Sequence, residues 1–295
     1  MITLHRTGAD PAAAENGDAR NFKRRATSAL VMAPVGILLA YIGGWLFLVV
    51  CLVVAGIILW EWTVLVARTQ DMRIFLPGAI ALIIAALLSS GGEPGAAFSI
   101  VAIGALLAGG FIAVWPRSYP ASDPLMWSAA GIVYAGIALI PTTTLRSDPD
   151  MGFAALLFLF ATVWATDVFA YLTGRAMGGP LLWPELSPKK TWAGAIGGLA
   201  GGVAAGTPVA YAIAGTGPVA AGVLALVLSI IAQGGDLFES AIKRRFGAKD
   251  AGSLIPGHGG AMDRLDGYLA AALVALLIGA LHRGTGAAAQ GLLVW

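Results

Sequence analysis

Charged residues are scarce in this sequence of 295 residues, because Asp, Glu, Lys and Arg together make up only 12% of it. In soluble domains their share is about 25%. Apolar residues account for 58% of the chain, and the mean hydropathy is +0.82. This composition excludes an ordinary soluble domain and predicts an all-α, polytopic membrane protein built as a bundle of transmembrane helices.

Cysteine is also nearly absent, since Cys51 is the only one. One cysteine can build neither a disulfide framework nor a thiolate metal site. The sequence contains no Gly-x4-Gly-Lys-Ser/Thr phosphate loop and no Gly-x-Ser-x-Gly nucleophile motif. Pro and Gly interruptions do not recur in matching halves, as an inverted-repeat transporter would suggest.

Apolar segments of about 17 to 25 residues can cross a bilayer as helices. We predict nine of them, at 26–43, 45–66, 74–90, 95–115, 125–141, 151–173, 191–213, 217–238 and 265–281. The segments at 26–43, 125–141 and 265–281 are short and could be shallow or partly re-entrant. A total of seven or eight spans therefore stays open.

Basic residues orient the predicted spans, because Lys and Arg in short loops stay on the cytoplasmic side. With the N-terminus inside, 16 of the 18 basic residues fall on that side, and only Arg146 and Arg283 fall outside. We expect a cytoplasmic N-terminus and an external C-terminus. The basic loops suit anionic lipid headgroups or a polyanionic substrate, although membrane topology alone explains them equally well.

The predicted chain organisation has four parts. Residues 1–25 form a disordered, basic cytoplasmic tail before a retained signal anchor. Residues 26–150 form the N-terminal transmembrane helices, and 151–283 a catalytic region with cytoplasmic loops. Residues 284–295 form a C-terminal tail.

Ionisable side chains within membrane spans are costly and therefore suggest function. Asp167 precedes Arg175 by eight residues, which places it about 12 Å into its span at 1.5 Å per residue. A buried carboxylate there needs a cation or a donor, and a structural hydrogen bond between helices is the alternative. For Glu61, between two tryptophans near the cytoplasmic end of its span, we expect a structural role.

A polar loop at 185–192 opens a Gly-rich helix. It contains Ser187, Lys189, Lys190 and Thr191. Hydroxyls, ammonium groups and free backbone N–H groups at a helix N-terminus form an anion site. Positive-inside anchoring explains the lysines but not the hydroxyls.

The densest charge lies in 240–266, where nine side chains are ionisable. Just before and within it, Asp236, Glu239, Ser240 and Lys243 are spaced i, i+3, i+4 and i+7, on one face of a helix end leaving the membrane. A purely hydrophobic span has no need for such a face.

A glycine-rich turn follows at 256–260 and lets the backbone approach a ligand closely. Its His258 could donate to a phosphate or cap the turn. Asp263 and Asp266 then flank Arg264 on the first turn of the last helix. Carboxylates suit Mg²⁺, and neighbouring Lys and Arg suit polyphosphate. The pattern predicts metal-assisted phosphoryl or nucleotidyl transfer at a membrane surface.

These residues strongly resemble the phosphatidate cytidylyltransferase family, also called CDP-diacylglycerol synthase. The family signature is Ser-x-x-Lys-Arg-x4-Lys-Asp-x-Gly/Ser-x-x-Ile/Leu-Pro-x-His-Gly-Gly-x-x-Asp-Arg-x-Asp. It is matched over 27 residues by Ser240, Lys243, Arg244, Lys249, Asp250, Gly252, Ile255, Pro256, His258, Gly259, Gly260, Asp263, Arg264 and Asp266. Together with the 187–192 loop and the Gly235-Asp236 pair, the likeness covers about 160–270. Ala193 and Ala261 depart from the family pattern, and we expect them to alter packing rather than chemistry.

The resemblance implies transfer of CMP from CTP to phosphatidate, with Mg²⁺, at the cytoplasmic face of the cell inner membrane. Phosphatidate needs no general base, because its second pKa lies at about 6 and its phosphate is largely ionised at neutral pH. Positioning and charge neutralisation would then carry catalysis.

The implied roles fall into two sets. Asp236 and Asp263 would hold the metal, with Asp167 and Asp266 as further ligands or bound to it through water. Lys243 and Arg264 would be catalytic together with Asp236 and Asp263. The substrates would contact Ser187, Lys189, Lys190, Thr191, Ser240, Arg244, Lys249, Asp250, His258, Gly259 and Gly260.

Two other interpretations stay open. One is a related CTP-dependent enzyme that acts on another lipid phosphate, or a polyprenol kinase. The other is an ion or lipid transporter with Asp167 and Glu61 as intramembrane relays, although the charges cluster at one surface. The expected partners are CTP, phosphatidate and the membrane, without nucleic acid, and a homodimer is possible.

Overall fold

The computed structural model describes residues 33–115, 123–252 and 259–295. Within these ranges, eight apolar helices are long enough to cross a membrane. They are α2 (Gly44–Ala67), α3 (Met72–Ser90), α4 (Pro94–Val114), α5 (Pro124–Ser147), α6 (Gly152–Met177), α7 (Trp192–Ala214), α8 (Pro218–Arg245) and α9 (Met262–Arg283). The predicted all-α polytopic bundle is confirmed, and the eight helices indicate a multi-pass membrane protein.

Eight of the nine predicted spans correspond to these helices. The first, at 26–43, begins outside the described residues, and its described part is a shorter apolar helix, Ala33–Ile42. Two segments that looked short in the sequence are full-length helices, because α5 has 24 residues and α9 has 22. Their ends are polar turns, which a search for apolar runs leaves out.

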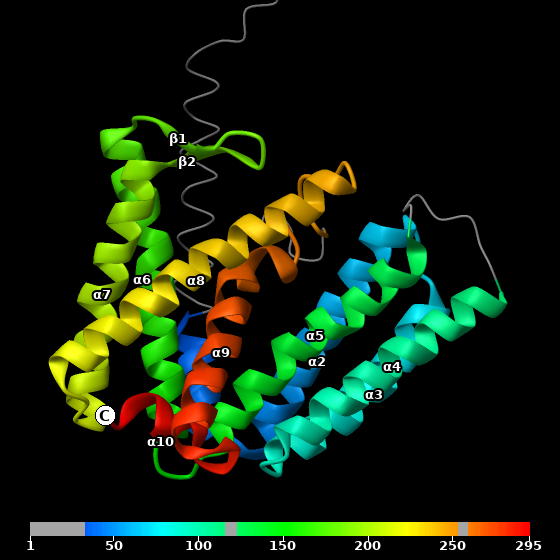
Figure 1. Ribbon diagram of the computed structural model, residues 1–295, viewed down its shortest axis with the longest axis horizontal. Coiled ribbons are helices and arrows are strands. Elements are labelled where there is room, and N and C mark those ends of the chain that lie inside the picture. Colours follow the sequence, from blue (N-terminus) through cyan, green and yellow to red (C-terminus); the bar gives the residue numbers. More distant parts are fainter. Residues whose placement is uncertain (1–32, 116–122, 253–258) are drawn as a thin grey trace, which may run out of the picture.

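The helices form two groups with α9 between them. Figure 1 shows α2, α3, α4 and α5 on one side and α6 and α7 on the other, with α8 crossing next to α9. Helix α9 packs against α8 and α5, so it joins the N-terminal helices to the C-terminal ones. This arrangement allows residues of the N-terminal half to reach the start of α9.

Small residues bring α6 and α7 close together. Gly194, Gly198, Gly201 and Gly206 of α7 are all buried. A Cβ atom on Gly198 would lie 2.9 Å from the carbonyl oxygen of Thr166 in α6. Since apolar side chains gain little from association in lipid, close backbone packing of this kind holds membrane helices together.

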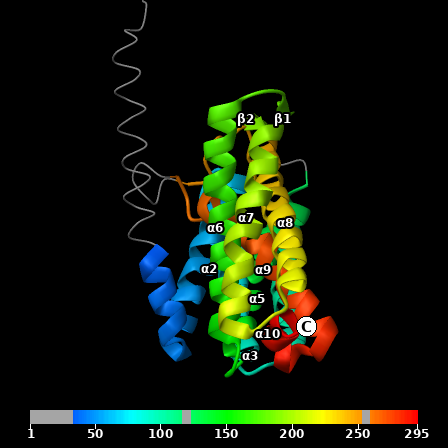
Figure 2. The ribbon, with the colours of Figure 1, turned by 90° about the vertical axis from the view of Figure 1, so that its left-hand side faces the viewer.

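A short antiparallel hairpin, β1 (Leu181–Trp183) and β2 (Ser187–Thr191), connects α6 to α7. The sequence predicted only a loop here. Thr191 caps α7, because its Oγ1 accepts a hydrogen bond of 3.1 Å from the backbone N–H of Gly194. Figure 2 shows the hairpin at one end of the bundle and the C-terminus at the other.

The chain ends in η1 (Thr285–Ala287) and α10 (Ala288–Leu293), which packs against α9. Leu292 and Leu293 are fully buried. The backbone N–H of Gln290 donates to Asp148 at 3.2 Å, which ties α10 to the end of α5. The last residues therefore close the end of the bundle that lies away from the hairpin.

Candidate active site

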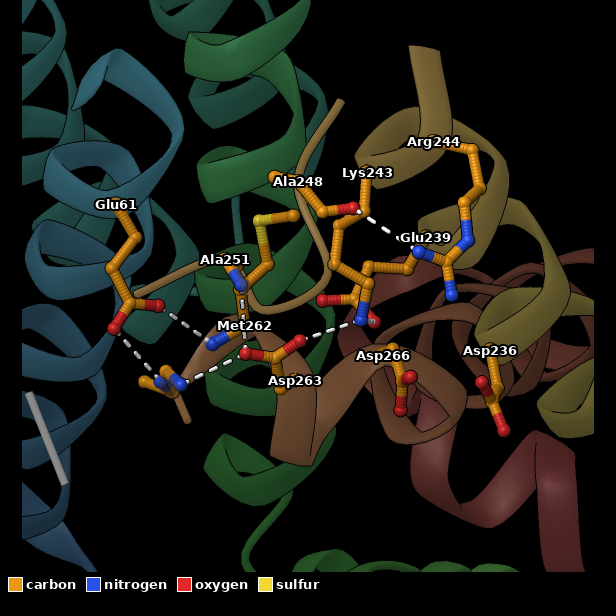
Figure 3. Close-up of polar contacts among 12 residues, drawn as sticks. Glu61, Asp236, Glu239, Lys243, Arg244, Ala248, Ala251, Met262, Asp263 and Asp266 are labelled. Carbon is orange, nitrogen blue, oxygen red and sulfur yellow. Dashed lines mark hydrogen bonds and ion pairs between the residues drawn. The ribbon is translucent and has the colours of Figure 1, made fainter. Parts of the chain in front are cut away.

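The centre of the charged region is Lys243, near the end of α8. Its Nζ donates to Glu239 Oε2 at 2.9 Å and to Asp263 Oδ1 at 2.5 Å (Figure 3). Glu239 is fully buried, and the side chains of Lys243 and Asp263 are only 12% and 10% exposed. An ammonium group has three N–H donors. Two are used in this way, and the third has no acceptor among the described residues.

Asp263 also organises the backbone around it. Its Oδ2 accepts hydrogen bonds from the N–H of Ala251 at 2.9 Å and of Gly260 at 2.8 Å. Gly259 has a φ of 81°, and a Cβ there would lie 2.8 Å from the same oxygen. Both carboxylate oxygens of Asp263 are therefore engaged, one by Lys243 and the other by the two sides of the glycine-rich turn.

A second charged group lies between β2, α6 and α8. Lys190 of β2 forms an ion pair with Asp236 of α8, and both side chains are partly exposed. Asp167 of α6 lies within electrostatic range of both. The sequence predicted a buried carboxylate with a cation beside it, whereas Asp167 is exposed and Lys190, which is paired with Asp236, lies within electrostatic range.

Asp266 lies between the two charged groups. Figure 3 shows it on α9 between Asp263 and Asp236. It accepts a hydrogen bond of 2.7 Å from the N–H of Gly267 and is within electrostatic range of Asp236 and Glu239. The end of the bundle that carries the hairpin thus has a row of carboxylates, and the ammonium groups of Lys190 and Lys243 lie among them.

The other predicted substrate contacts lie around this row. Arg244 reaches towards the hairpin, where its Nε lies 3.4 Å from the carbonyl oxygen of Leu186. Ser187 and Ser240 are half-buried, whereas Lys189, Lys249, Asp250 and Arg264 are exposed. His258, predicted to contact phosphate, lies outside the described residues.

The carboxylates fit a divalent cation only in part. Across 33–115, 123–252 and 259–295, no three Asp, Glu, His or Cys side chains converge into a ready-made metal site. Asp263 accepts three hydrogen bonds, Asp236 is paired with Lys190 and Asp266 accepts from Gly267, yet each carboxylate keeps further lone pairs, and Asp167 lies nearby. Mg²⁺ commonly uses one or two carboxylates and completes its shell with phosphate oxygens and water. This donor set fits that pattern.

Two residues near the site were not among the predicted site residues. Glu239 was noticed on the helix face, and its i, i+4 spacing to Lys243 is the signal that could have identified their ion pair. Glu61, on α2, accepts hydrogen bonds from the backbone N–H groups of Ala261 at 3.0 Å and Met262 at 2.9 Å. These contacts tie α2 to the start of α9, and nothing in the sequence indicated these partners.

Comparison with known proteins identifies the family. A model described as the cytidylyltransferase family matches residues 23–282, which is most of the chain. The chain belongs to this family.

Relatives with assigned names support the same grouping. The phosphatidate cytidylyltransferase of Brucella abortus is 43% identical over 261 residues, which cover 88% of this chain and 94% of the relative. That of Brucella melitensis is 42% identical over the same coverage. The phosphatidate cytidylyltransferase of Staphylococcus saprophyticus is 41% identical over 141 residues, 47% of this chain and 52% of the relative. The family predicted from the signature at 240–266 is thereby confirmed.

Proposed function

We propose that the protein transfers CMP from CTP to phosphatidate and releases pyrophosphate, with CDP-diacylglycerol as the lipid product. Relatives that are named phosphatidate cytidylyltransferase, and that match this chain over 94% of their own length, support this function. The observation that carries it is the Lys243 cluster, in which an ammonium group is fixed by Glu239 and Asp263 and keeps one donor for an anionic substrate.

The reaction needs charge control rather than a base. An oxygen of the phosphatidate phosphate attacks the α-phosphorus of CTP, the bond to the bridging oxygen breaks, and pyrophosphate leaves with the electron pair. Because two anions must approach each other, the main task of the protein is to neutralise and orient them. Lys243 does so from a fixed position, since its two carboxylate partners hold the ammonium in place.

Cations at the rim of the site complete the proposed substrate contacts. Exposed cations are Lys189 on β2, Lys249 after the end of α8 and Arg264 in the first turn of α9. Arg can grip phosphate oxygens in a bidentate manner, whereas Lys acts as a point charge. We assign the CTP phosphates and the phosphatidate headgroup to these cations together with Lys190 and Arg244.

Mg²⁺ is the proposed cofactor, and the charge balance of the site supports it. Five carboxylates, those of Asp167, Asp236, Glu239, Asp263 and Asp266, accompany two ammonium groups, those of Lys190 and Lys243. When ionised, these carboxylates outnumber the two ammonium groups among them, and a divalent cation together with the rim cations would offset that local excess. Asp236 and Asp266 would hold Mg²⁺, with Asp263 and Asp167 nearby, and the ion would supply Lewis-acid activation of the phosphate.

The proposed location is the cytoplasmic leaflet of the cell inner membrane. The helix ends next to the site carry basic residues, namely Arg68 and Arg73 between α2 and the start of α3, and Arg175 near the end of α6. Arg146 lies near the end of α5, on the other side of the bundle. The positive-inside rule makes the basic side cytoplasmic. CTP would then arrive from the cytosol and phosphatidate from the adjoining leaflet.

The direct test uses purified protein in mixed micelles that contain phosphatidate. Addition of CTP and Mg²⁺ should yield CDP-diacylglycerol and pyrophosphate in equal amounts, detected by mass spectrometry and a coupled pyrophosphatase assay. Omission of phosphatidate, or addition of EDTA, should abolish both products. Pyrophosphate released without any CDP-lipid would refute the proposed transfer.

A further inference from the structure

Glu61 binds the start of the helix that carries Asp263. Its side chain is buried, with 3% exposed, and its two oxygens accept from the N–H groups of Ala261 and Met262, where α9 begins. The first N–H groups of a helix have no partner within it. A carboxylate satisfies two of them and suits the positive end of the helix dipole. This contact joins residues 200 positions apart in the chain.

The glycine-rich segment is shaped around the same carboxylate. A Cβ atom on Gly252 would lie 2.7 Å from Glu61 Oε1, and one on Gly260 would lie 2.5 Å from Oε2. Real Cβ atoms do not approach oxygen so closely, so a larger residue at either position would force the Glu61 carboxylate to move away from the backbone it binds. The backbone on both sides of 253–258 therefore packs directly against Glu61.

The end of α2 also contacts the end of α8. Arg68, the C-cap of α2, donates through Nη2 to the carbonyl oxygen of Phe246, the C-cap of α8. Arg68 has a φ of 58°, a left-handed conformation that non-glycine residues seldom adopt. Helix α2 thus contacts the end of α8 through Arg68 and the start of α9 through Glu61.

We propose that α2 is a positioning element for the active site, acting through Glu61 and Arg68. Glu61 takes the amides of Ala261 and Met262, while Asp263 takes the neighbouring amide of Gly260. The two carboxylates together set the first turn of α9, and this turn aims Asp263 at Lys243. Neither α2 residue needs to touch the substrate. For its activity readout, the proposal rests on the proposed function.

The first test is Glu61→Gln, which keeps the size of the side chain but leaves one acceptor oxygen and turns an amide N–H₂ towards a backbone donor. We expect kcat to fall by roughly tenfold, the equivalent of losing one hydrogen bond to a charged group. KM for CTP should change much less, because the rim cations remain. Hydrogen exchange should quicken in peptides covering 259–265 and stay unchanged in α3 and α4.

The matched control is Thr63→Val, on the same helix and equally buried. Within the described part of the chain, the Thr63 hydroxyl donates to Leu59 of its own helix alone, at 2.7 Å. If Glu61 served stability alone, both variants would lower the melting temperature while turnover per folded molecule stayed at the wild-type value. Such a result, or unchanged exchange at 259–265 in Glu61→Gln, would overturn the proposal.

Arg68→Gln provides a second variant at an exposed position, in case Glu61→Gln does not fold. It should quicken exchange at 246–249 and lower kcat, and a folded Arg68→Gln protein with wild-type turnover and exchange would equally overturn the proposal. If the wild-type protein made no CDP-lipid, the proposed function would fail. The exchange measurements would then decide the role of α2 on their own.

Discussion

Replacing Asp263 with Asn tests the arrangement around Lys243 in a single step. The native carboxylate accepts one hydrogen bond from an ammonium group and two from backbone N–H groups. Asn has one acceptor oxygen, and its N–H₂ group must face either Lys243 or the backbone donors. Whichever orientation it takes, donors on one side lose their acceptor and face other donors.

The size of the effect follows from the lost contact. A hydrogen bond to a charged group contributes about 1.5–3 kcal/mol. At about 1.4 kcal/mol per factor of ten, losing the bond to Lys243 should lower kcat by roughly 10- to 100-fold if that bond orients Lys243 in the transition state. The partial burial of both side chains means that water does not compensate for the loss.

The assay measures initial rates of CDP-diacylglycerol formation per folded molecule, over a range of Mg²⁺ concentrations. Asp150→Asn is the matched control, because Asp150 lies at the other end of the bundle, where it accepts from Gln290 at 3.1 Å. Asp263→Asn should be slow at every Mg²⁺ concentration. Partial rescue by excess Mg²⁺ would instead make Asp263 a metal ligand, and turnover above half the wild-type value would refute a role for the Lys243 contact.

Three further predictions concern substrate binding, packing and topology. Lys189→Gln combined with Lys190→Gln should raise the KM for CTP by about tenfold or more, and unchanged kinetics in an inserted protein would leave the lysines with only a topological role. Gly201→Ala places a Cβ against an aromatic ring of α6 and should cost about 1–3 kcal/mol of stability, seen as a lower melting temperature with turnover per folded molecule preserved. A cysteine at Ala248 should react with impermeant reagents only from the cytoplasmic side and one at Thr285 only from outside, and the reverse pattern would contradict the proposed orientation.

Local patterns in the sequence predicted much of this structure. Apolar runs located the eight long helices, because a bilayer demands continuous hydrophobic length. The charged face of α8 was also readable, and its i, i+4 spacing matches the observed pair of Glu239 and Lys243. The signature located the start of α9 as part of the site. Each of these features depends on residues close together in the chain.

Contacts between distant segments could not be predicted in the same way. Asp236 shares a helix face with Lys243, yet its observed partner is Lys190 from the hairpin. Glu61 of α2 reaches Met262 of α9 because both helices pack against α5, an arrangement that no local spacing encodes. Asp263 was predicted as a metal ligand, and only the structure shows that it also accepts hydrogen bonds from three donors. Tertiary packing decides which of several carboxylates is available for a metal.

The measurement that tests the central claim most directly follows the two ends of the CTP phosphate chain. Purified protein is given phosphatidate with CTP labelled at either the α- or the γ-phosphate, and label is measured in the lipid fraction. Cytidylyl transfer predicts that the α-label enters the lipid and that the γ-label is released as pyrophosphate. Transfer of the γ-label to the lipid would reveal a kinase and contradict the account.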